Sequence, residues 1–488
     1  MLRSSLRRIA IQSGRRYSTK QKVIFLDEKQ LEALGRDELG QVQAAEHFEA
    51  LLPENQEPYV RRSPEALFGK KRIGHVELPK SVNKAITEFM NNRPDNHIVR
   101  TDALKMFAAL RNYEVIGEDN DASAGSPKKK RQQKKSVEPQ TLTYGPRETV
   151  AYTVGLAPAN YGPAYNILHE LSNRLSDFDP KSMLDFGTGP GTALWAAQEV
   201  FPKISELTGV DISEDMIKMA EYIDENSRKT DDKDKMSVQF RRYMEMNPKL
   251  KKPDLVISSY TLGEIPSEAL RKSVVEQLWE QTDDILVLID RGNPAGFERI
   301  AQARQIILDR DEDVHVVSPC PHDAPCPMLF SPNAKPHKSW CHFSQRIQRP
   351  SFLMKTKHAK NNIEDAKYSY VVLRRGKRPL PSSSTTASSE ASTSGMELEA
   401  YRWPRLVLPP RKNPRHVVLD VCSKTGEIQR MTIPKSQGKI PYRDARKVMW
   451  GDLYPHPPKT KIVTRMVKAE EPLEADKEQE KKEEPIKV

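Results

Sequence analysis

The stretch Met183–Gly191, MLDFGTGPG, decides the fold that we expect for this 488-residue chain. It combines a short apolar run, an acid at Asp185 and three glycines, Gly187, Gly189 and Gly191, and the helix-like segment TALWAAQEVF follows it. Glycines allow the backbone to pass close to a ligand, and the N-terminus of the next helix offers unpaired N–H donors. The spacing is G-x-G-x-G, whereas the dinucleotide fingerprint G-x-G-x-x-G needs a glycine where Thr192 stands.

A second apolar strand, LTGVDI at Leu207–Ile212, brings an acid to its carboxyl end at Asp211. An acid at this place can accept hydrogen bonds from a ribose diol. Further strand-like segments lie at 238–241, 254–260 and 284–290, with helix-like segments between them. Strands that alternate with helices form parallel sheets. We therefore predict an α/β fold with a doubly wound sheet, preceded by a helical region and followed by a small β module.

The glycine loop, Asp211 and the repeated β–α units resemble class I S-adenosylmethionine methyltransferases. The resemblance implies that Asp185, Gly187, Gly189, Gly191 and Asp211 bind S-adenosylmethionine, with Asp185 and the glycine loop flanking its methionine moiety.

Catalytic residues for base methylation are harder to find. The segment 257–266, ISSYTLGEIP, lacks the [DNS]-PP-[FYW] motif of amino-directed enzymes, and no cysteine precedes Cys320 to serve as the nucleophile of a cytosine-C5 enzyme. Tyr260 and Glu264 suit a different acceptor, although such residues beside a cofactor are more often structural. We therefore predict no catalytic residue and leave methyl transfer open.

The four cysteines are Cys320, Cys326, Cys341 and Cys422, and three of them fall in one proline-rich region, SPCPHDAPCPMLF and SWCHF. Prolines favour a stiff, helix-free loop. Four thiolates can bind a tetrahedral zinc ion or an iron–sulfur cluster. Zinc ligands usually come in close pairs, whereas the spacing here is C-x5-C-x14-C-x80-C, which favours [4Fe–4S]. Zinc, and buried or reactive cysteines without metal, remain alternatives. Because Cys422 ends the strand-like segment HVVLDVC, a metal there would join the C-terminal module to the sheet.

The first twenty residues, MLRSSLRRIAIQSGRRYSTK, are rich in arginine and serine and contain no acid. This composition is typical of a mitochondrial transit peptide, so we expect a matrix protein. The formal net charge of +11 favours polyanionic partners such as RNA, although ordinary basic loops would give the same balance. The sequence contains no apolar run of about 18 residues, so we predict no membrane span.

Composition predicts seven segments. They are a transit peptide (1–20), a helical N-terminal region (27–116), a disordered basic loop (117–140), a methyltransferase-like domain (144–378) that includes the cysteine loop (318–345), a Ser-rich linker (380–396), a β module (398–455) and a disordered charged tail (468–488). In the module, Tyr442, Trp450 and Tyr454 lie among five cations, Lys435, Lys439, Arg443, Arg446 and Lys447. Cations among aromatic rings can contact phosphates and stacked bases, or the rings can be core anchors.

With these residues in place, the chain resembles the methyltransferase-like assembly factors of the mitochondrial small ribosomal subunit. The resemblance spans most of residues 60–455 and rests on SPEALFGKKR (63–72), AYTVGLAPANYGPAYNILHEL (151–171), LDFGTGPGT, LVLIDRGNPAGF (286–297), CPHDAPCP, WCHFSQ and YRDARKVMWGDLYP. It implies a protein that is monomeric when free, binds the small subunit through rRNA and ribosomal proteins, carries [4Fe–4S] on the four cysteines and has lost methyl transfer. An active rRNA methyltransferase is the main alternative, and a metabolic methyltransferase is another.

Overall fold

The computed structural model describes residues 62–94, 96–112, 143–228, 238–245, 249, 251–335, 338–379 and 393–469. The predicted transit peptide, basic loop and all but the first two residues of the charged tail lie outside these ranges, as do residues 380–392 of the predicted Ser-rich linker. The described residues belong to one compact unit that begins at Arg62.

The predicted α/β fold is confirmed by a nine-stranded, mostly parallel sheet. Its order is β1-β8-β9-β6-β5-β2-β3-β4, and β7 also pairs with β9. Strands β4, β3, β2, β5 and β6 run parallel to one another, whereas β9 is antiparallel to β6, β7 and β8. A parallel sheet in which the order of the strands reverses at β2, with an antiparallel strand beyond β6, is the arrangement of class I methyltransferases. The strands are β1 (His75–Val76), β2 (Ser182–Phe186), β3 (Glu206–Val210), β4 (Gln239–Arg241), β5 (Leu255–Ser259), β6 (Ile285–Arg291), β7 (Val314–Ser318), β8 (Phe343–Gln348) and β9 (Ile363–Arg375).

Strand β6 shows why the sheet is covered on both faces. Its residues Ile285, Val287 and Ile289 belong to one buried core, and Leu286 and Leu288 belong to another. Since successive side chains of a strand point to opposite faces, an uninterrupted apolar run requires a helical layer on each side.

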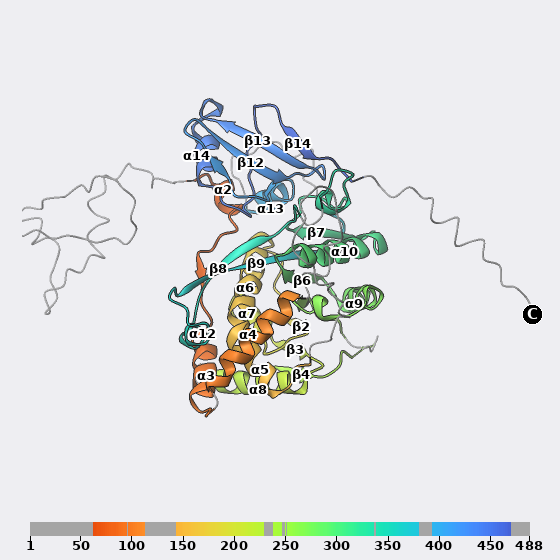
Figure 1. Cartoon of the computed structure of the whole chain (residues 1–488). Helices are drawn as coiled ribbons and strands as arrows, with labels where there is room; N and C mark the ends of the chain where they lie inside the picture. Colours follow the sequence, from red (N-terminus) through yellow and green to blue (C-terminus); the bar gives the residue numbers. More distant parts are fainter. Residues whose placement is uncertain are drawn as a thin grey trace, which may run out of the picture. The chain divides into compact units, whose positions relative to one another are not determined.

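The two helical layers lie on opposite faces of the sheet (Figure 1). Helices α9 and α10 pack on one core, and α3, α5, α6, α7, α8 and α12 pack on the other. The helices are α2 (Pro64–Phe68), α3 (Lys80–Asn91), α4 (Asn96–Asn112), α5 (Pro146–Gly155), α6 (Ala157–Arg174), α7 (Thr192–Val200), α8 (Glu214–Arg228), α9 (Glu268–Gln281), α10 (Pro294–Arg310), α11 (Pro327–Phe330), α12 (Ser351–Lys357), α13 (Thr393–Ala400) and α14 (Lys439–Lys447).

Strand β9 organises the edge from which the cysteine loop leaves. Its first half pairs with β8 as far as Tyr368↔Phe343, and its second half pairs with β7 from Val372↔Ser318 onward. Residues 369–371 of β9 therefore have no strand partner on this side, and the chain between β7 and β8 protrudes there. This gap places the cysteine loop between the sheet and the C-terminal module.

The C-terminal module is a separate five-stranded antiparallel sheet with its own core. Its strands are β10 (Arg405–Leu406), β11 (Arg411–Lys412), β12 (His416–Cys422), β13 (Ile428–Pro434) and β14 (Val463–Met466). The sheet therefore extends past residue 455, and α13 begins inside the range predicted as linker. Figure 1 shows the module beyond β7, with α2 beside it.

The segment that follows Arg62 connects the module to the large sheet. The backbone N–H of Leu453 donates to the carbonyl oxygen of Gly69 (2.8 Å), and Phe68 packs edge-on against Trp403. A few residues later, β1 adds a parallel strand to β8.

Among the described residues no helix is long and apolar enough to cross a membrane.

Helix α6 approaches β8 so closely that Gly162 has no room for a side chain, because an added Cβ would lie 2.4 Å from Cγ2 of Ile347. We predict that Gly162→Ala lowers the free energy of unfolding by about 1–3 kcal/mol through overpacking. The opposing gain in helix propensity is about 1 kcal/mol or less. Chemical denaturation measures the difference. Gly395→Ala, at an exposed position of α13, is the control and should leave stability unchanged or slightly raised. Stabilisation of Gly162→Ala would contradict the close approach.

Candidate functional site

The glycine loop forms the turn between β2 and α7. Gly187, Gly189 and Gly191 all have positive φ, at 74°, 53° and 100°, a conformation that favours glycine. At Gly187 the space is closed as well, because an added Cβ would lie 2.0 Å from Oγ1 of Thr261. The loop therefore depends on these glycines for its own packing.

Asp211 fixes the middle of this loop. One carboxylate oxygen accepts a hydrogen bond from the N–H of Gly189 (2.8 Å), and the other accepts one from the N–H of Ser213 (2.9 Å). Burial raises the pKa of Asp211, although these two hydrogen bonds oppose the shift. The structure therefore brings Asp211 and the glycine loop together, as the sequence predicts for a cofactor site.

Asp185 lies beneath the loop and is 1% exposed. Its Oδ2 accepts a hydrogen bond from the hydroxyl of Thr188 (2.7 Å), and its Oδ1 has no partner among the described residues. Burial raises the pKa of Asp185 to about 7, and the nearby Asp211 adds to the shift. A buried carboxylate oxygen without a partner is costly, so Asp185 has capacity for a donor from a ligand.

Two tyrosines that the sequence did not single out close over this region. The hydroxyl of Tyr144 donates to Glu264 (2.7 Å), and the ring of Tyr144 packs edge-on against Tyr152. The hydroxyl of Ser213 donates to the carbonyl oxygen of Tyr144 (2.8 Å). Burial raises the pKa of Glu264 to about 7. The sequence signal that could have pointed to these tyrosines is the Gly145–Pro146 pair that begins α5. Tyr144 lies just before this helix, and Tyr152 lies inside it.

The four cysteines line one cavity of about 30 Å³, although they come from distant parts of the chain. Cys320 follows β7, Cys326 precedes α11, Cys341 precedes β8 and Cys422 ends β12. Residues 369–371, which lack a strand partner on this edge of β9, line the same cavity. The hydroxyl of Ser369 donates to the carbonyl oxygen of Cys341 (2.8 Å) and fixes one end of the loop.

The thiols interact with one another electrostatically. Burial raises the pKa of Cys326 to about 11 and those of Cys341 and Cys422 well above the usual value, and repulsion from the other cysteines adds to each shift. Without a ligand, Cys326, Cys341 and Cys422 stay protonated at neutral pH, so metal binding must displace their protons. Among the described residues no group of three or more His, Cys, Asp or Glu side chains is arranged to hold a single metal ion.

His322 lies beside the cysteine site and contacts it as a neutral ring. Its Nδ1 is 3.0 Å from the carbonyl oxygen of Ala324, and its Nε2 is 3.3 Å from Sγ of Cys422. Because a carbonyl only accepts, Nδ1 carries the proton and Nε2 is free to accept one from the Cys422 thiol. Burial lowers the pKa of His322 to about 3, so the ring is neutral.

A comparison with known protein families covers both the glycine loop and the cysteine site. The profile of the family described as mitochondrial small ribosomal subunit Rsm22 matches residues 146–455, which include the glycine loop and all four cysteines. The chain belongs to the Rsm22 family.

Several relatives carry matching names. The chain is 31% identical over 325 residues to the ribosome assembly protein METTL17, mitochondrial, of Homo sapiens, covering 65% of this chain and 64% of that protein. It is 30% identical over 334 residues to the Rsm22-cox11 tandem protein 2, mitochondrial, of Schizosaccharomyces pombe, and this match covers 64% of this chain and 44% of that protein. It is 25% identical over 434 residues to the ribosome assembly protein RSM22, mitochondrial, of Saccharomyces cerevisiae, and this match covers 64% of this chain and 68% of that protein. The match thus spans less than two thirds of the length of each of the first two relatives.

Solved structures also match, with low overall similarity. A putative RNA methyltransferase from Pyrococcus horikoshii is 15% identical, with a TM-score of 0.27, and the match covers 44% of this chain and 82% of that one. The plantazolicin methyltransferase BamL, solved with a triazolic desmethylPZN analog and SAH, is 15% identical with a TM-score of 0.31, and the match covers 58% of this chain and 99% of that one.

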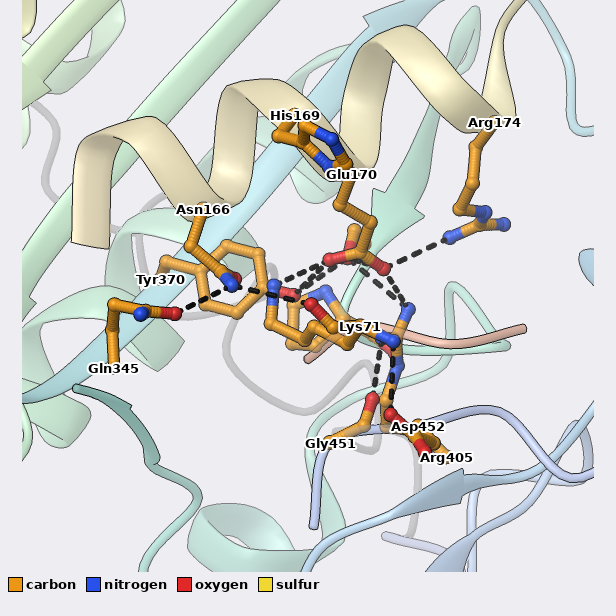
Figure 2. A network of polar contacts seen from close by, with 12 residues as sticks. Lys71, Asn166, His169, Glu170, Arg174, Gln345, Tyr370, Arg405, Gly451 and Asp452 are labelled. Carbon is orange, nitrogen blue, oxygen red and sulfur yellow. Dashed lines mark hydrogen bonds and ion pairs between the residues drawn. The ribbon is translucent and has the colours of Figure 1, made fainter. Parts of the chain in front are cut away.

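This Rsm22-family chain contains a buried ion network (Figure 2), and two of its members, Tyr370 and Arg405, also line the cysteine cavity. Glu170 of α6 is at its centre and contacts Lys71 (2.5 Å), Arg405 (2.6 Å) and, more distantly, Arg174 (3.8 Å). The hydroxyl of Tyr370 donates to the same carboxylate (2.9 Å). Burial alone would raise the pKa of Glu170, but the cations Arg405, Lys71 and Arg174 outweigh it and hold this pKa well below the usual range. Burial lowers the pKa of Lys71 to about 8, although Glu170 opposes this.

Arg405 carries this network into the cysteine loop and the C-terminal module. Its Nε donates to the carbonyl oxygen of Pro319 (3.0 Å), next to Cys320, and its Nη1 donates to that of Gly451 (2.8 Å). It is 1% exposed. One side chain therefore holds the loop, the module and α6 together.

The aromatic residues near α14 act as anchors within the chain, although Tyr442 and Trp450 stay partly exposed. Tyr454 is buried, Trp450 packs edge-on against His342 (4.8 Å), and the hydroxyl of Tyr442 donates to the carbonyl oxygen of Pro414 (3.1 Å). The exposed cations near them are Lys435, Lys439 and Arg446.

We predict that Arg405→Met lowers the free energy of unfolding by about 3–5 kcal/mol, because it removes one partner from a buried ion network and leaves carbonyl oxygens unpaired. Chemical denaturation measures the loss. The control is Arg411→Met in the same module, whose guanidinium is 56% exposed and lies 3.6 Å from Asp420. It should change stability by no more than about 0.5 kcal/mol. Equal effects of both variants would remove Arg405 from this role.

Proposed function

We propose that this protein is an assembly factor of the mitochondrial small ribosomal subunit that contacts rRNA and neighbouring ribosomal proteins in the matrix. The observation that carries the proposal is the family match, which runs from the glycine loop through the four-cysteine junction to the C-terminal module. The basic balance of the chain and the exposed Lys435, Lys439 and Arg446 support contact with phosphates. The arginine-rich residues 1–20 support import into the matrix.

Within this role the four cysteines hold a [4Fe–4S] cluster. Four thiols around one cavity are the donor set that such clusters use. Thiolates on a single zinc ion lie about 3.8 Å apart, given a Zn–S bond of about 2.3 Å and tetrahedral angles. A cluster holds its thiolates farther apart, one on each iron. The four cysteines line one cavity but are separated by 5, 14 and 80 residues rather than arranged in close pairs, and this spacing favours the cluster over zinc.

The role that we assign to the cluster is structural. Its ligands come from the loop after β7, from the approach to β8 and from the last residue of β12. A group bound to all four joins the module to the large sheet, so its binding energy contributes to folding of this junction.

The glycine loop binds S-adenosylmethionine without supporting methyl transfer. The unpaired Oδ1 of Asp185 suits the ammonium group of the methionine moiety. The carboxylate of Asp211 has lone pairs left for a ribose diol, since each oxygen accepts one hydrogen bond from the backbone. Bound S-adenosylmethionine would carry an activated methyl group, but nearby Glu264 is engaged by the hydroxyl of Tyr144.

The test of the function is Cys422→Ser in the full chain, purified without oxygen. We predict that wild-type protein contains about four iron and four sulfide ions per chain. The variant should lose both, because serine is a poor cluster ligand, and it should co-sediment less with the mitochondrial small ribosomal subunit. Elemental analysis and gradient sedimentation measure these outcomes.

Thr425→Ser, in the exposed turn that follows β12, is the matched control and should behave as the wild type. Stoichiometric zinc without sulfide would refute the cluster. Normal iron content with no association of the wild type with the small subunit would refute the assembly role.

Cofactor binding should depend on pH through Asp185. Ionised Asp185 attracts an ammonium group and protonated Asp185 does not, so affinity should rise as pH rises towards about 7. Below that value we predict a loss of about tenfold per pH unit. Calorimetric titration with S-adenosylmethionine measures it. Asp185→Asn should bind more weakly and lose this slope, whereas Glu214→Gln, an exposed acid on α8, should keep it. A flat wild-type profile would exclude Asp185 as the partner.

A further inference from the structure

Arg304 of α10 is a buried cation beside the four cysteines. It is 2% exposed and lines the same cavity. Its Nη2 donates to the carbonyl oxygens of His322 (2.8 Å) and Ala324 (3.0 Å), so one end of the guanidinium holds the loop between Cys320 and Cys326. Its Nε and Nη1 have no partner among the described residues.

A buried guanidinium with two unpaired N–H groups is costly, and it normally faces an anion. The nearest acid in the loop, Asp323, is already bound by both ends of Arg378, with contacts of 2.6 Å and 2.7 Å. Arg405 also lines the cavity, but its guanidinium is already paired with Glu170. Within the described residues, no acid forms a hydrogen bond with Nε or Nη1 of Arg304.

The electrostatic effect of Arg304 falls on the thiols. Arg304 lines the cavity together with all four cysteines, so its guanidinium lies beside any group that the thiolates hold. Asp323 reaches Arg304 only electrostatically and is hydrogen-bonded to Arg378, so Nε and Nη1 of Arg304 have no acid bound to them among the described residues. With four thiolates around a metal–sulfur core, the cavity would hold a buried anion. A cluster with a 2+ core and four thiolates carries a net charge of −2, and one added electron makes it −3.

We infer that Arg304 is the counter-charge of the thiolate-bound group in this cavity, and that it raises the reduction potential of the group by stabilising its more negative form. The inference rests on the proposed cluster. The free Nε and Nη1 of Arg304 are the donors available to its sulfur atoms, while Nη2 keeps the loop in place.

The experiment compares Arg304→Gln with Arg304→Lys in the full chain, purified without oxygen. Glutamine keeps a hydrogen-bond donor and removes the charge, whereas lysine keeps the charge and loses the planar fork. At a fixed potential, set by dithionite and mediators and read by electron paramagnetic resonance, we expect the ratio of reduced to oxidised cluster in Arg304→Gln to fall at least tenfold. For one electron this equals about 59 mV. Arg304→Lys should stay near the wild type.

Arg310→Gln is the matched control, since Arg310 is on the same helix, pairs with Glu276 and Glu280, and is 42% exposed. It should not change the ratio. Unchanged ratios in both Arg304 variants would overturn the inference. Equal shifts in both, or failure of both to load iron, would also overturn it, because they would show that Arg304 acts only by holding the loop. Loading in Arg304→Lys but not in Arg304→Gln would support the counter-charge.

Failure of the proposed cluster is distinguishable from failure of this inference. If wild-type protein carries zinc and no sulfide, the cluster is wrong, and the same variants are compared by loss of zinc to a chelator. At least tenfold faster loss from Arg304→Gln than from Arg304→Lys would support the counter-charge on a zinc–thiolate group. Equal rates would overturn it. Wild-type protein without iron or zinc would overturn both proposals.

Discussion

The structure depends on one buried carboxylate, Glu170, which faces the cations Lys71, Arg174 and Arg405. A buried charge is tolerated only while its partners stay in place, since an unpaired ion in the interior is strongly destabilising. The partners of Glu170 belong to the segment that passes α2, to α6 itself and to β10 of the module. The hydroxyl of Ser318, at the end of β7, donates to the same carboxylate (3.1 Å). The N-terminal segment, the large sheet and the module are therefore positioned by a common interaction, and none can shift without exposing or breaking it.

The cysteine cavity is a consequence of this junction. Arg405 contacts Glu170 on one side and the carbonyl oxygen next to Cys320 on the other, so the same side chain sets the distance between sheet and loop. Three cations against one carboxylate leave a surplus of buried positive charge beside thiols that are neutral only while protonated. A metal–thiolate group of negative charge would reduce that surplus. The ion network and the cysteine site are, on this view, two halves of one electrostatic arrangement, and the unpaired end of Arg304 points to the same conclusion from α10.

Much of the sheet could be predicted because its signals are local. The segment MLDFGTGPG forms β2 and the glycine turn, and the apolar run of β6 lies between two helical layers, as its composition requires. The position of β9 could not be predicted, since nothing in its sequence specifies that β6 pairs with one edge and both β7 and β8 pair with the other. The same limit applies to Glu170, whose partner Lys71 lies 99 positions away. The aromatic rings near α14 show a different limit, because a Tyr or Trp among cations has the same sequence pattern whether its ring is open or buried.

The glycine loop requires a distinction between packing and binding. Gly187 faces Thr261 at a distance that admits no side chain, and Asp211 holds the N–H of Gly189, so the chain's own contacts require both features. A loop of this kind would keep its glycines even if it bound nothing, and the motif therefore says less about cofactor binding than its resemblance implies. Asp185 is different, because packing leaves one of its buried oxygens unpaired and raises its pKa to about 7. That oxygen is a cost to the fold without an evident structural return. The argument for a cofactor consequently rests on Asp185 more than on the glycines beside it.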